Sequence, residues 1–118
     1  MQKLLFIIHA APYGNESFFS GLRLALQIQE QYKSAVELKL FLMSDAVAGG
    51  LAKQNPAEGY HIQQMLEILT AQGAAVKLCK TCTNARGMTD LPLAEGVQIG
   101  TLAELADWSI EADKVFNF

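Results

Sequence analysis

The sequence predicts an α/β fold in which a mainly parallel sheet of about five strands is covered by helices on both faces. Two observations lead to this prediction. Short apolar segments of strand type alternate along the chain with longer segments that have helical periodicity or helix caps, an order typical of parallel sheets. The first strand segment, Lys3 to His9, is continuously apolar from Leu4 to Ile8, as expected for a strand buried on both faces.

The predicted elements follow one another in a regular order. Five segments have the apolar character of strands: residues 3–9, 36–43, 75–79, 97–99 and 114–118. Four segments have the spacing or the caps of helices: residues 15–32, 46–53, 56–72 and 101–112. Residues 88–96 contain Pro92 and no long period, so we expect a connection there with at most one helical turn. We expect residues 1–118 to form a single domain around one core.

The elements of the first half are recognised by their caps and periodicity. Residues 10–14 interrupt the first strand, and Asn15 offers an N-cap to the following helix. That helix is apolar around much of its circumference, which predicts a second face packed against another subunit. Residues 36–43 alternate and then become continuously apolar, which predicts a strand that ends at Ser44-Asp45. Gly49-Gly50 breaks the short helix that follows.

The elements of the second half have stronger boundary signals. Asn55-Pro56-Ala57-Glu58 combines an N-cap, a proline in the first turn and a capping-box acid, so we expect a helix from about Pro56. Gly73 stands where a C-terminal glycine ends that helix, and the third strand follows directly. Thr101 and Glu104 form a capping box at the start of the last helix. We expect this helix to pack through Leu102, Leu105, Ala106 and Trp108.

Composition restricts the classes of partner. The net charge of −3 provides no basic surface of the kind that nucleic acids or anionic membranes bind, so we expect neither partner. With 51% hydrophobic residues, the chain is expected to bury further surface between subunits as a homo-oligomer. The apolar run Leu4–Ile8 is too short for a signal peptide or a membrane span, so we expect a cytoplasmic protein.

Both cysteines lie directly after the third strand. Cys79 ends an apolar run, and Cys82 follows three residues later in a polar segment, to Gly87, that we expect to be a loop. In a reducing compartment this spacing favours redox, sulfur or metal chemistry over a structural disulfide. The alternative interpretation is a buried cysteine that packs as a small hydrophobic residue.

Positive charge is concentrated around the cysteine pair. Lys77, Lys80 and Arg86 are close in sequence, and no acidic residue occurs between Glu67 and Asp90. Nearby cations favour a thiolate over a thiol. We therefore expect the thiol of Cys79 to ionise easily.

The carboxyl ends of the predicted strands define one candidate site. Ligands of parallel α/β folds bind outside these ends. That edge would gather His9–Asn15, Ser44-Asp45 and Cys79–Arg86. Within it, Asp45 can orient a ligand, although Ser44-Asp45 is also an ordinary helix cap, which we favour. Tyr13 either lines the pocket or stacks at a subunit contact.

Other uses of a cysteine pair fit the sequence less well. Thioredoxin-type oxidoreductases place Cys-x-x-Cys at the start of a long helix, whereas only Thr83 to Gly87 follow here. Zinc requires further ligands, and His9 and His61 lie far from the pair in sequence, so we expect no metal site. Neither a Walker motif nor a dinucleotide fingerprint is present, so we expect no cofactor.

Taken together, several segments resemble the DsrE/DsrF-like family of small sulfur-handling proteins: residues 11–16, 22–25, 41–47, 59–72, 79–82 and 85–87. The resemblance implies a three-layer α/β/α sandwich and a homohexamer. It also implies that Cys79 carries sulfur as a persulfide, because relay members of the family use the matching cysteine. Arg86-Gly87 matches an arginine-glycine pair of the family. Cys82 is a feature of one branch, and its role stays open.

Three functional hypotheses follow. In the leading one, the protein is a persulfide carrier or transferase: Cys79 receives sulfane sulfur from a donor protein and passes it to an acceptor. Lys80 and Arg86 would favour the anion, and Cys82 would assist release. In the second, the protein is a non-catalytic oligomeric module that binds a small ligand or a partner segment at the strand ends. In the third, Cys79 and Cys82 form a redox-active dithiol.

Overall fold

The centre of the molecule is a sheet of five parallel strands. The computed structural model describes residues 1–57 and 59–118. The strands are β1 (Gln2–Ile8), β2 (Val36–Leu42), β3 (Ala75–Cys79), β4 (Val97–Gly100) and β5 (Lys114–Asn117). They lie in the order β4-β3-β2-β1-β5, and every neighbouring pair is parallel. The predicted sheet is therefore confirmed.

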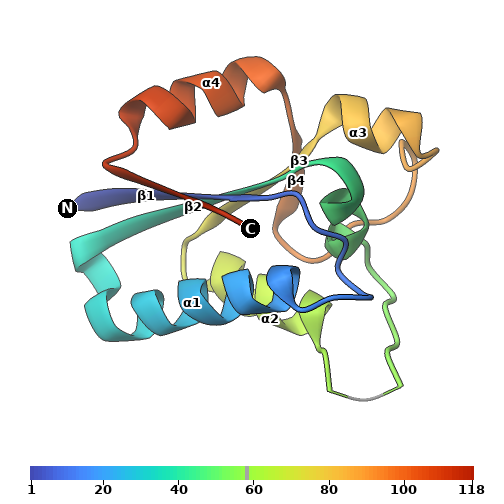
Figure 1. The fold of residues 1–118 in the computed structure, drawn as a ribbon, viewed down its shortest axis with the longest axis horizontal. Coiled ribbons are helices and arrows are strands. Elements are labelled where there is room, and N and C mark those ends of the chain that lie inside the picture. The colour runs from blue at the N-terminus through green and yellow to red at the C-terminus, as the bar shows by residue number, and fades with distance from the viewer. Residues whose placement is uncertain (58) are drawn as a thin grey trace.

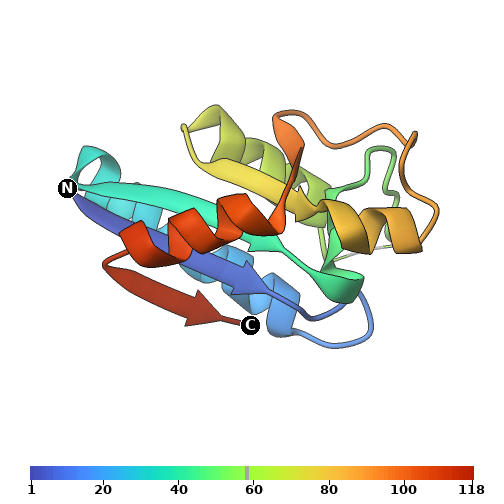
Figure 2. The same ribbon diagram turned by 90° about the horizontal axis from the view of Figure 1, so that it is seen from above.

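Helices cover both faces of this sheet. One layer contains α1 (Ser17–Tyr32) and α2 (Ile62–Ala71), and the opposite layer contains α3 (Lys80–Ala85) and α4 (Leu102–Glu111) (Figures 1 and 2). Two 3-10 helices, η1 (Lys33–Ala35) and η2 (Ser44–Gly50), stand before and after β2. The result is the three-layer α/β/α sandwich that the family resemblance implied.

The core lies on both faces of the two central strands. Phe6 on β1 and Phe41 on β2 are fully buried, and Phe18 of α1 is buried beneath the helix layer. Because helices cover both faces, a central strand has no solvent-facing side and its apolar residues need not alternate with polar ones. This explains the continuous apolar run of β1.

The start of α2 differs from the prediction. The helix begins at Ile62 rather than near Pro56. The preceding chain is held by Gln54, whose side chain donates hydrogen bonds of 2.8 Å to the carbonyl oxygens of Gly49 and Leu51. Its backbone N–H donates to Gln63 Oε1 of α2 at 3.0 Å. The segment before α2 is therefore hydrogen-bonded to the helix without being part of it. The expected capping-box acid, Glu58, lies outside the described residues.

The caps of α1 and α4 follow the prediction more closely. At α1 the N-cap residue is Glu16, one position after the predicted Asn15, but Asn15 Oδ1 still accepts a hydrogen bond of 3.0 Å from the N–H of Ser17. At α4, Thr101 Oγ1 accepts from the N–H of Glu104 at 3.2 Å, and Glu104 Oε1 accepts from the N–H of Thr101 at 2.9 Å. The predicted capping box is thus present in both directions.

The packing face of α4 was predicted only in part. Leu105 is buried, and Trp108 is half-buried with its ring 6.0 Å from that of Phe41. Leu102, however, is 66% exposed and Ala106 is also exposed, so the prediction that they pack in the core is wrong. Both lie on the outer face of α4 together with Ile110, which follows Ala106 by four residues and is 88% exposed.

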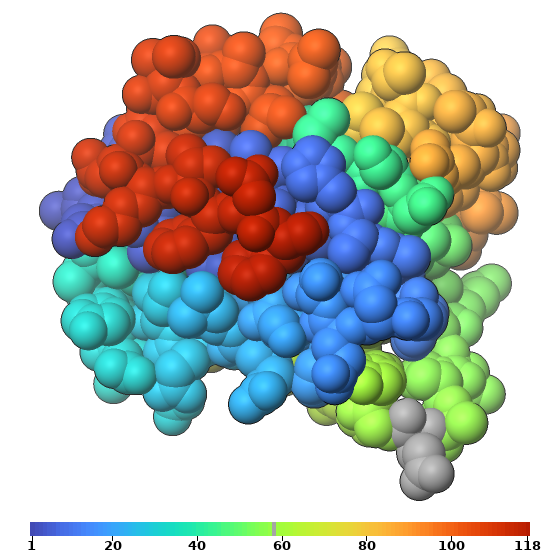
Figure 3. Space-filling view, in the orientation of Figure 1, coloured from blue at the N-terminus to red at the C-terminus, as the bar shows by residue number. Residues whose placement is uncertain are grey.

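The first and last strands of the chain are neighbours at one side of the sheet. Strand β5 pairs with β1, and the N–H of Phe118 donates to Ile7 O at 2.9 Å, while Phe118 O accepts from the N–H of His9 at 3.0 Å. The last strand is open to solvent on one face of the molecule, between α1 and α4 (Figure 3). Within residues 1–57 and 59–118, no helix has the length and apolar character needed to cross a membrane.

Candidate dithiol site

The carboxyl ends of β1, β2 and β3 are adjacent at one edge of the sheet. Ile8 is aligned with Leu42, and Leu42 with Leu78, so the chain leaves these three strands at the same level. The N–H of Met43, immediately after β2, donates to Ile8 O at 2.9 Å. This register explains why the segments that follow the three strands lie together, as the sequence predicted.

Cys79 is the last residue of β3 and also the N-cap residue of α3. The segment after it is a short helix rather than the predicted loop. Two features stabilise this helix: the buried hydroxyl of Thr83 donates to Lys80 O at 2.9 Å, and Gly87, at φ +69°, donates its N–H to Asn84 O at 3.2 Å. Cys-x-x-Cys thus opens a helix here, although a short one.

The environment of Cys79 favours its neutral form. Its side chain is buried, with the residue only 5% exposed, and this burial raises the pKa of the thiol. The hydrogen bond with the Cys82 side chain raises the pKa further, while the backbone N–H groups of Cys82 and Thr81 act in the opposite direction. The expectation that this thiol ionises easily is therefore wrong for the protomer.

The two lysines nearest to Cys79 in sequence do not contact its thiol. Lys77 forms an ion pair with Glu104 of α4, and its ammonium group also lies 5.3 Å from the centroid of the Trp108 ring. Lys80 is exposed at the first position of α3. The prediction from the sequence therefore overestimated how far Lys77 and Lys80 lower the pKa of the Cys79 thiol.

Cys82 is the more accessible of the two free thiols. It is half-buried, and its Sγ accepts a hydrogen bond of 3.2 Å from the N–H of Ser44 at the start of η2. Ser44 has φ +54°, a left-handed conformation that is unfavourable for residues other than glycine. The chain therefore adopts a strained turn after β2 that directs a backbone donor at the Cys82 sulfur.

Arg86 connects α3 to the turn after β2. Its Nε and Nη2 donate to Asp45 Oδ1 at 3.2 and 2.9 Å, and its Nη1 donates to Cys82 O at 3.1 Å. Asp45 thus pairs with Arg86 across two elements, whereas η2 has no side-chain cap, so the favoured interpretation of Asp45 as a helix cap is wrong. An exposed pair of this kind contributes about 1 kcal/mol at most.

Tyr13 lies in a different part of this edge. Its hydroxyl donates to Gln54 Oε1 at 2.6 Å, and burial raises its pKa. Together with Pro56 and Tyr60 it lines a surface hollow of about 380 Å³. The structure therefore brings Cys79, Cys82, Asp45 and Arg86 together and places Tyr13 against Gln54 instead.

The sequence did not indicate the roles of Ser44 and Thr83 in this site. The donor to Cys82 is a backbone group of Ser44, and its orientation depends on a φ angle that a serine does not reveal in sequence. Thr83 supports α3 through a buried hydroxyl, although threonine has a low helix propensity. A threonine three residues after Lys80 is compatible with such a bond but does not predict it.

Within the described part of the chain, no three His, Cys, Asp or Glu side chains are grouped closely enough to hold a metal ion. The groups that the structure does bring together at this site are two free thiols, Cys79 and Cys82. The two cysteines are three residues apart at the start of α3, and their side chains are hydrogen-bonded to each other. The N–H of Ser44 donates to the Cys82 sulfur, and Arg86 donates to Cys82 O.

Comparisons with known proteins give a consistent result. The model of the DsrE/DsrF-like family matches residues 2–118. Protein YchN of Escherichia coli (strain K12) is 61% identical over 118 residues, which is 100% of each chain. The crystal structure of the ychN protein from E. coli has a TM-score of 0.96 over 100% of both chains. A protein of unknown function from Methanobacterium thermoautotrophicum, MTH1491, shares the fold, with a TM-score of 0.80 over 100% of both chains at 17% identity.

Proposed function

This chain belongs to the DsrE/DsrF-like family, and from that premise we propose that it is a sulfur-relay protein in which Cys79 carries sulfane sulfur as a persulfide. The observation that supports the proposal most directly is the position of Cys79. It ends β3 at the carboxyl edge of a parallel sheet, with a second thiol one helical turn away.

Loading requires a donor protein that presents a persulfide. The Cys79 thiolate attacks the terminal sulfur of the donor, a new S–S bond forms on Cys79, and the donor leaves as its thiolate. The backbone N–H groups of Thr81 and Cys82, which favour the anionic form of Cys79, stand at this sulfur. Lys80 and Arg86 add positive charge around the same turn.

Cys82 assists release. Its thiolate attacks the Cys79 sulfur of the persulfide, so that a Cys79–Cys82 disulfide forms and hydrosulfide leaves with the electron pair of the broken S–S bond. The oxidising equivalent comes from the persulfide itself. The hydrogen bond from Ser44 fixes the position of the Cys82 sulfur for this attack. When an acceptor protein is present, its thiolate takes the terminal sulfur instead.

We place this activity in a cytoplasmic homohexamer with separate sulfur donor and acceptor proteins. The assembly is inferred from the family and from the high apolar content of the chain. The exposed apolar residues on α4 and β5 support it, since such side chains are commonly covered in assemblies. Tyr13 and Asp45 border the same edge and would contact an incoming partner.

Intact-mass spectrometry tests the proposal. The purified protein is measured before and after incubation with a cysteine desulfurase and cysteine, for the wild type, Cys79→Ser and Cys82→Ser. We expect the wild type and Cys82→Ser to gain one reducible sulfur atom and Cys79→Ser to gain none. Cys82→Ser should retain the sulfur longer, because the release step is blocked. Loading of Cys79→Ser to the wild-type level would exclude Cys79 as the carrier.

A dithiol redox protein is the second candidate, and the start of α3 favours it. Because Cys79 is the N-cap of a helix and Cys82 lies in its first turn, the pair has the local arrangement of a redox-active Cys-x-x-Cys. The same mass experiment distinguishes this candidate: a loss of two hydrogens on oxidation, reversed by a cellular dithiol reductant, without any sulfur adduct, would support it.

A binding module is the remaining alternative. The hollow lined by Tyr13, Pro56 and Tyr60 shows that this side of the molecule has a concave surface away from the thiols. Binding of a small ligand or partner segment that survives in the Cys79→Ser/Cys82→Ser double variant, together with no sulfur loading of the wild type, would favour this function.

A further inference from the structure

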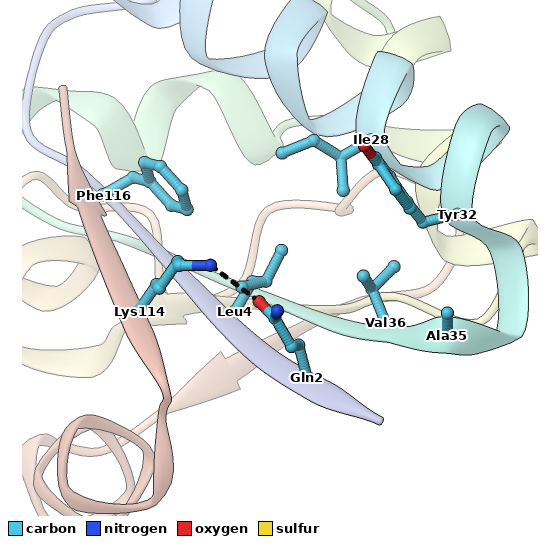
Figure 4. Close-up of a pocket in the computed structure, with 8 residues that line it drawn as sticks. All are labelled: Gln2, Leu4, Ile28, Tyr32, Ala35, Val36, Lys114 and Phe116. Carbon is cyan, nitrogen blue, oxygen red and sulfur yellow. Dashed lines mark hydrogen bonds between the residues drawn. The ribbon is translucent and has the colours of Figure 1, made fainter.

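Figure 4 shows a second hollow, which has a volume of about 300 Å³. It lies at the end of the sheet where the strands begin, whereas Cys79 stands where β3 ends. We call it the amino-end hollow, because it opens where β1, β2 and β5 begin. Its roof is formed by Ile28 and Tyr32, which are four residues apart and therefore on one side of α1. Pockets for small molecules typically have volumes of about 300 to 1,000 Å³, so the hollow fits a small ligand.

The strand register makes the floor of the amino-end hollow apolar. Leu4 is aligned with Lys114 of β5, and Phe6 with Phe116, so Leu4 and Phe116 project from the same face of the sheet. Val36 on β2 is aligned with Gln2 and completes this floor. Leu4 is buried, while Phe116 and Val36 are half-buried. An apolar ligand group placed here would cover side chains that are now partly in water.

One cation stands at the rim. Lys114 Nζ donates a hydrogen bond of 2.9 Å to Gln2 Oε1 (Figure 4). Among the described residues, no carboxylate lies within ion-pair distance of Lys114, in contrast to Lys39, Lys77 and Arg86. A lysine ammonium has three donors, and the bond to Gln2 uses one of them. The rim therefore offers donors and a positive charge beside an apolar floor.

We propose that the amino-end hollow binds a small amphipathic carboxylate, such as a medium-chain fatty acid. The apolar chain lies between Ile28 and the floor formed by Leu4 and Phe116, and the carboxylate accepts hydrogen bonds from Lys114. A single ammonium group matches a monoanion, and the apolar floor disfavours sugars and polyphosphates, whose polar groups would be left without partners. The ligand does not involve the thiols, so this site is independent of sulfur transfer.

Isothermal titration of the intact oligomer with octanoate and with octan-1-ol tests the site. Octanoate should bind the wild type more tightly than octan-1-ol does. Lys114→Met should weaken octanoate binding about fivefold, as expected for one partly exposed ion pair, and leave octan-1-ol binding unchanged. Ile28→Trp fills the hollow and should weaken the binding of both compounds at least tenfold.

Matched controls separate the site from nonspecific binding. Lys3→Met removes the same charge from the neighbouring strand position, and Ile68→Trp adds the same bulk on α2, where Ile68 is 40% exposed. Both should bind octanoate as the wild type does. The proposal is overturned if Lys3→Met weakens binding as much as Lys114→Met, or if the wild type does not bind octanoate. It is also overturned if Ile28→Trp changes the oligomer mass without affecting octanoate binding, because the hollow would then be a contact between copies.

Discussion

At the scale of single residues, the reactivity of the site depends on how deeply each sulfur is buried. Cys79 is 5% exposed and its pKa is raised by burial, whereas Cys82 is half-buried and accepts a backbone hydrogen bond. Since the thiolate is the nucleophile, we expect the Cys79 thiol to react more slowly than an exposed cysteine in the isolated protomer.

The pH dependence of Cys79 alkylation follows from these causes. In wild-type protein, the rate with iodoacetamide should keep rising with pH beyond the point where a free cysteine is fully ionised. Cys82→Ala removes the side-chain hydrogen bond that raises the pKa of Cys79, so its profile should shift to lower pH. Peptide mass spectrometry over about pH 6 to 10 covers the usual range of thiol ionisation. A shift to higher pH would contradict this explanation.

We expect the ion pair of Arg86 and Asp45 to affect access to Cys79 more than the stability of the fold. Asp45→Asn should reduce the free energy of unfolding by less than about 1 kcal/mol, because both side chains are partly exposed. In a Cys82→Ala background, it should nevertheless accelerate alkylation of Cys79, since α3 is released from η2. Urea titration and alkylation rates measure the two effects. Asp90→Asn, an exposed acid beyond α3, is the control and should change neither.

At the scale of elements, the strands and the short helix after β2 were predictable, whereas the start of α2 and the helix α3 were not. The strands are apolar, and their residues differ from the prediction by about one position, because burial on both faces leaves a continuous signal. The false start at Pro56 arose because its capping residues are a purely local pattern, whereas Gln54 is fixed by hydrogen bonds with Gln63 and with Tyr13, 41 residues away. The helix α3 was missed because Thr, Cys and Asn have low helix propensity and its support comes from tertiary contacts.

The same difference applies to the candidate site. The gathering of Asp45 and Arg86 with the cysteines followed from strand ends and parallel order, which a sequence pattern contains. The burial of Cys79 and the left-handed turn at Ser44 depend on packing and on one backbone angle. No residue type in the segment predicts either of them.

The capping box of α4 should be measurable as stability. Thr101→Ala removes the acceptor of the Glu104 N–H and should reduce the free energy of unfolding by about 1 kcal/mol, while Thr101→Ser should retain most of it. Urea titration with a helix-sensitive signal makes the comparison. A loss in Thr101→Ser as large as in Thr101→Ala would show that the methyl group, and not the hydroxyl, is responsible.

Glu104 adds a pH dependence to the same helix. The side-chain hydrogen bond from Lys77 lowers the pKa of Glu104 in the folded protein, and the backbone N–H of Thr101 lowers it further. Its stabilising effect is therefore complete above the ordinary carboxyl pKa and is lost as the pH falls through the lower, folded value. Glu104→Gln should lack this part of the acid sensitivity in unfolding curves recorded across the acidic range. An unchanged acid profile would exclude this role.

At the scale of the whole molecule, α4 presents an apolar stripe to solvent. Leu102, Ala106 and Ile110 recur at intervals of four residues on its outer face, and Ile110 is 88% exposed. The cost of leaving such a stripe in water supports the homo-oligomer of our proposal. Ile99 of the edge strand β4 is also 39% exposed.

A charge in this stripe should therefore change the assembly and not the fold. Ile110→Asp should reduce the mass measured by light scattering, with far-UV circular dichroism unchanged. Gln64→Asp on the exposed side of α2 introduces the same residue elsewhere and should leave the mass as in the wild type. If Ile110→Asp has the wild-type mass, the α4 stripe is not the contact between copies.

The pairing of β1 with β5 joins the beginning of the chain to its end. Two hydrogen bonds join Lys3 and Asp113. The N–H of Lys3 donates to Asp113 Oδ2 at 2.8 Å, and the N–H of Asp113 donates to Lys3 O at 2.8 Å. During synthesis β1 is made long before β5, so one of its two edges stays unpaired until residues 114–117 have been made. Until then, that edge is an open template for another chain. Newly made protein is therefore more exposed to strand pairing between chains than the finished fold, in which β5 covers this edge.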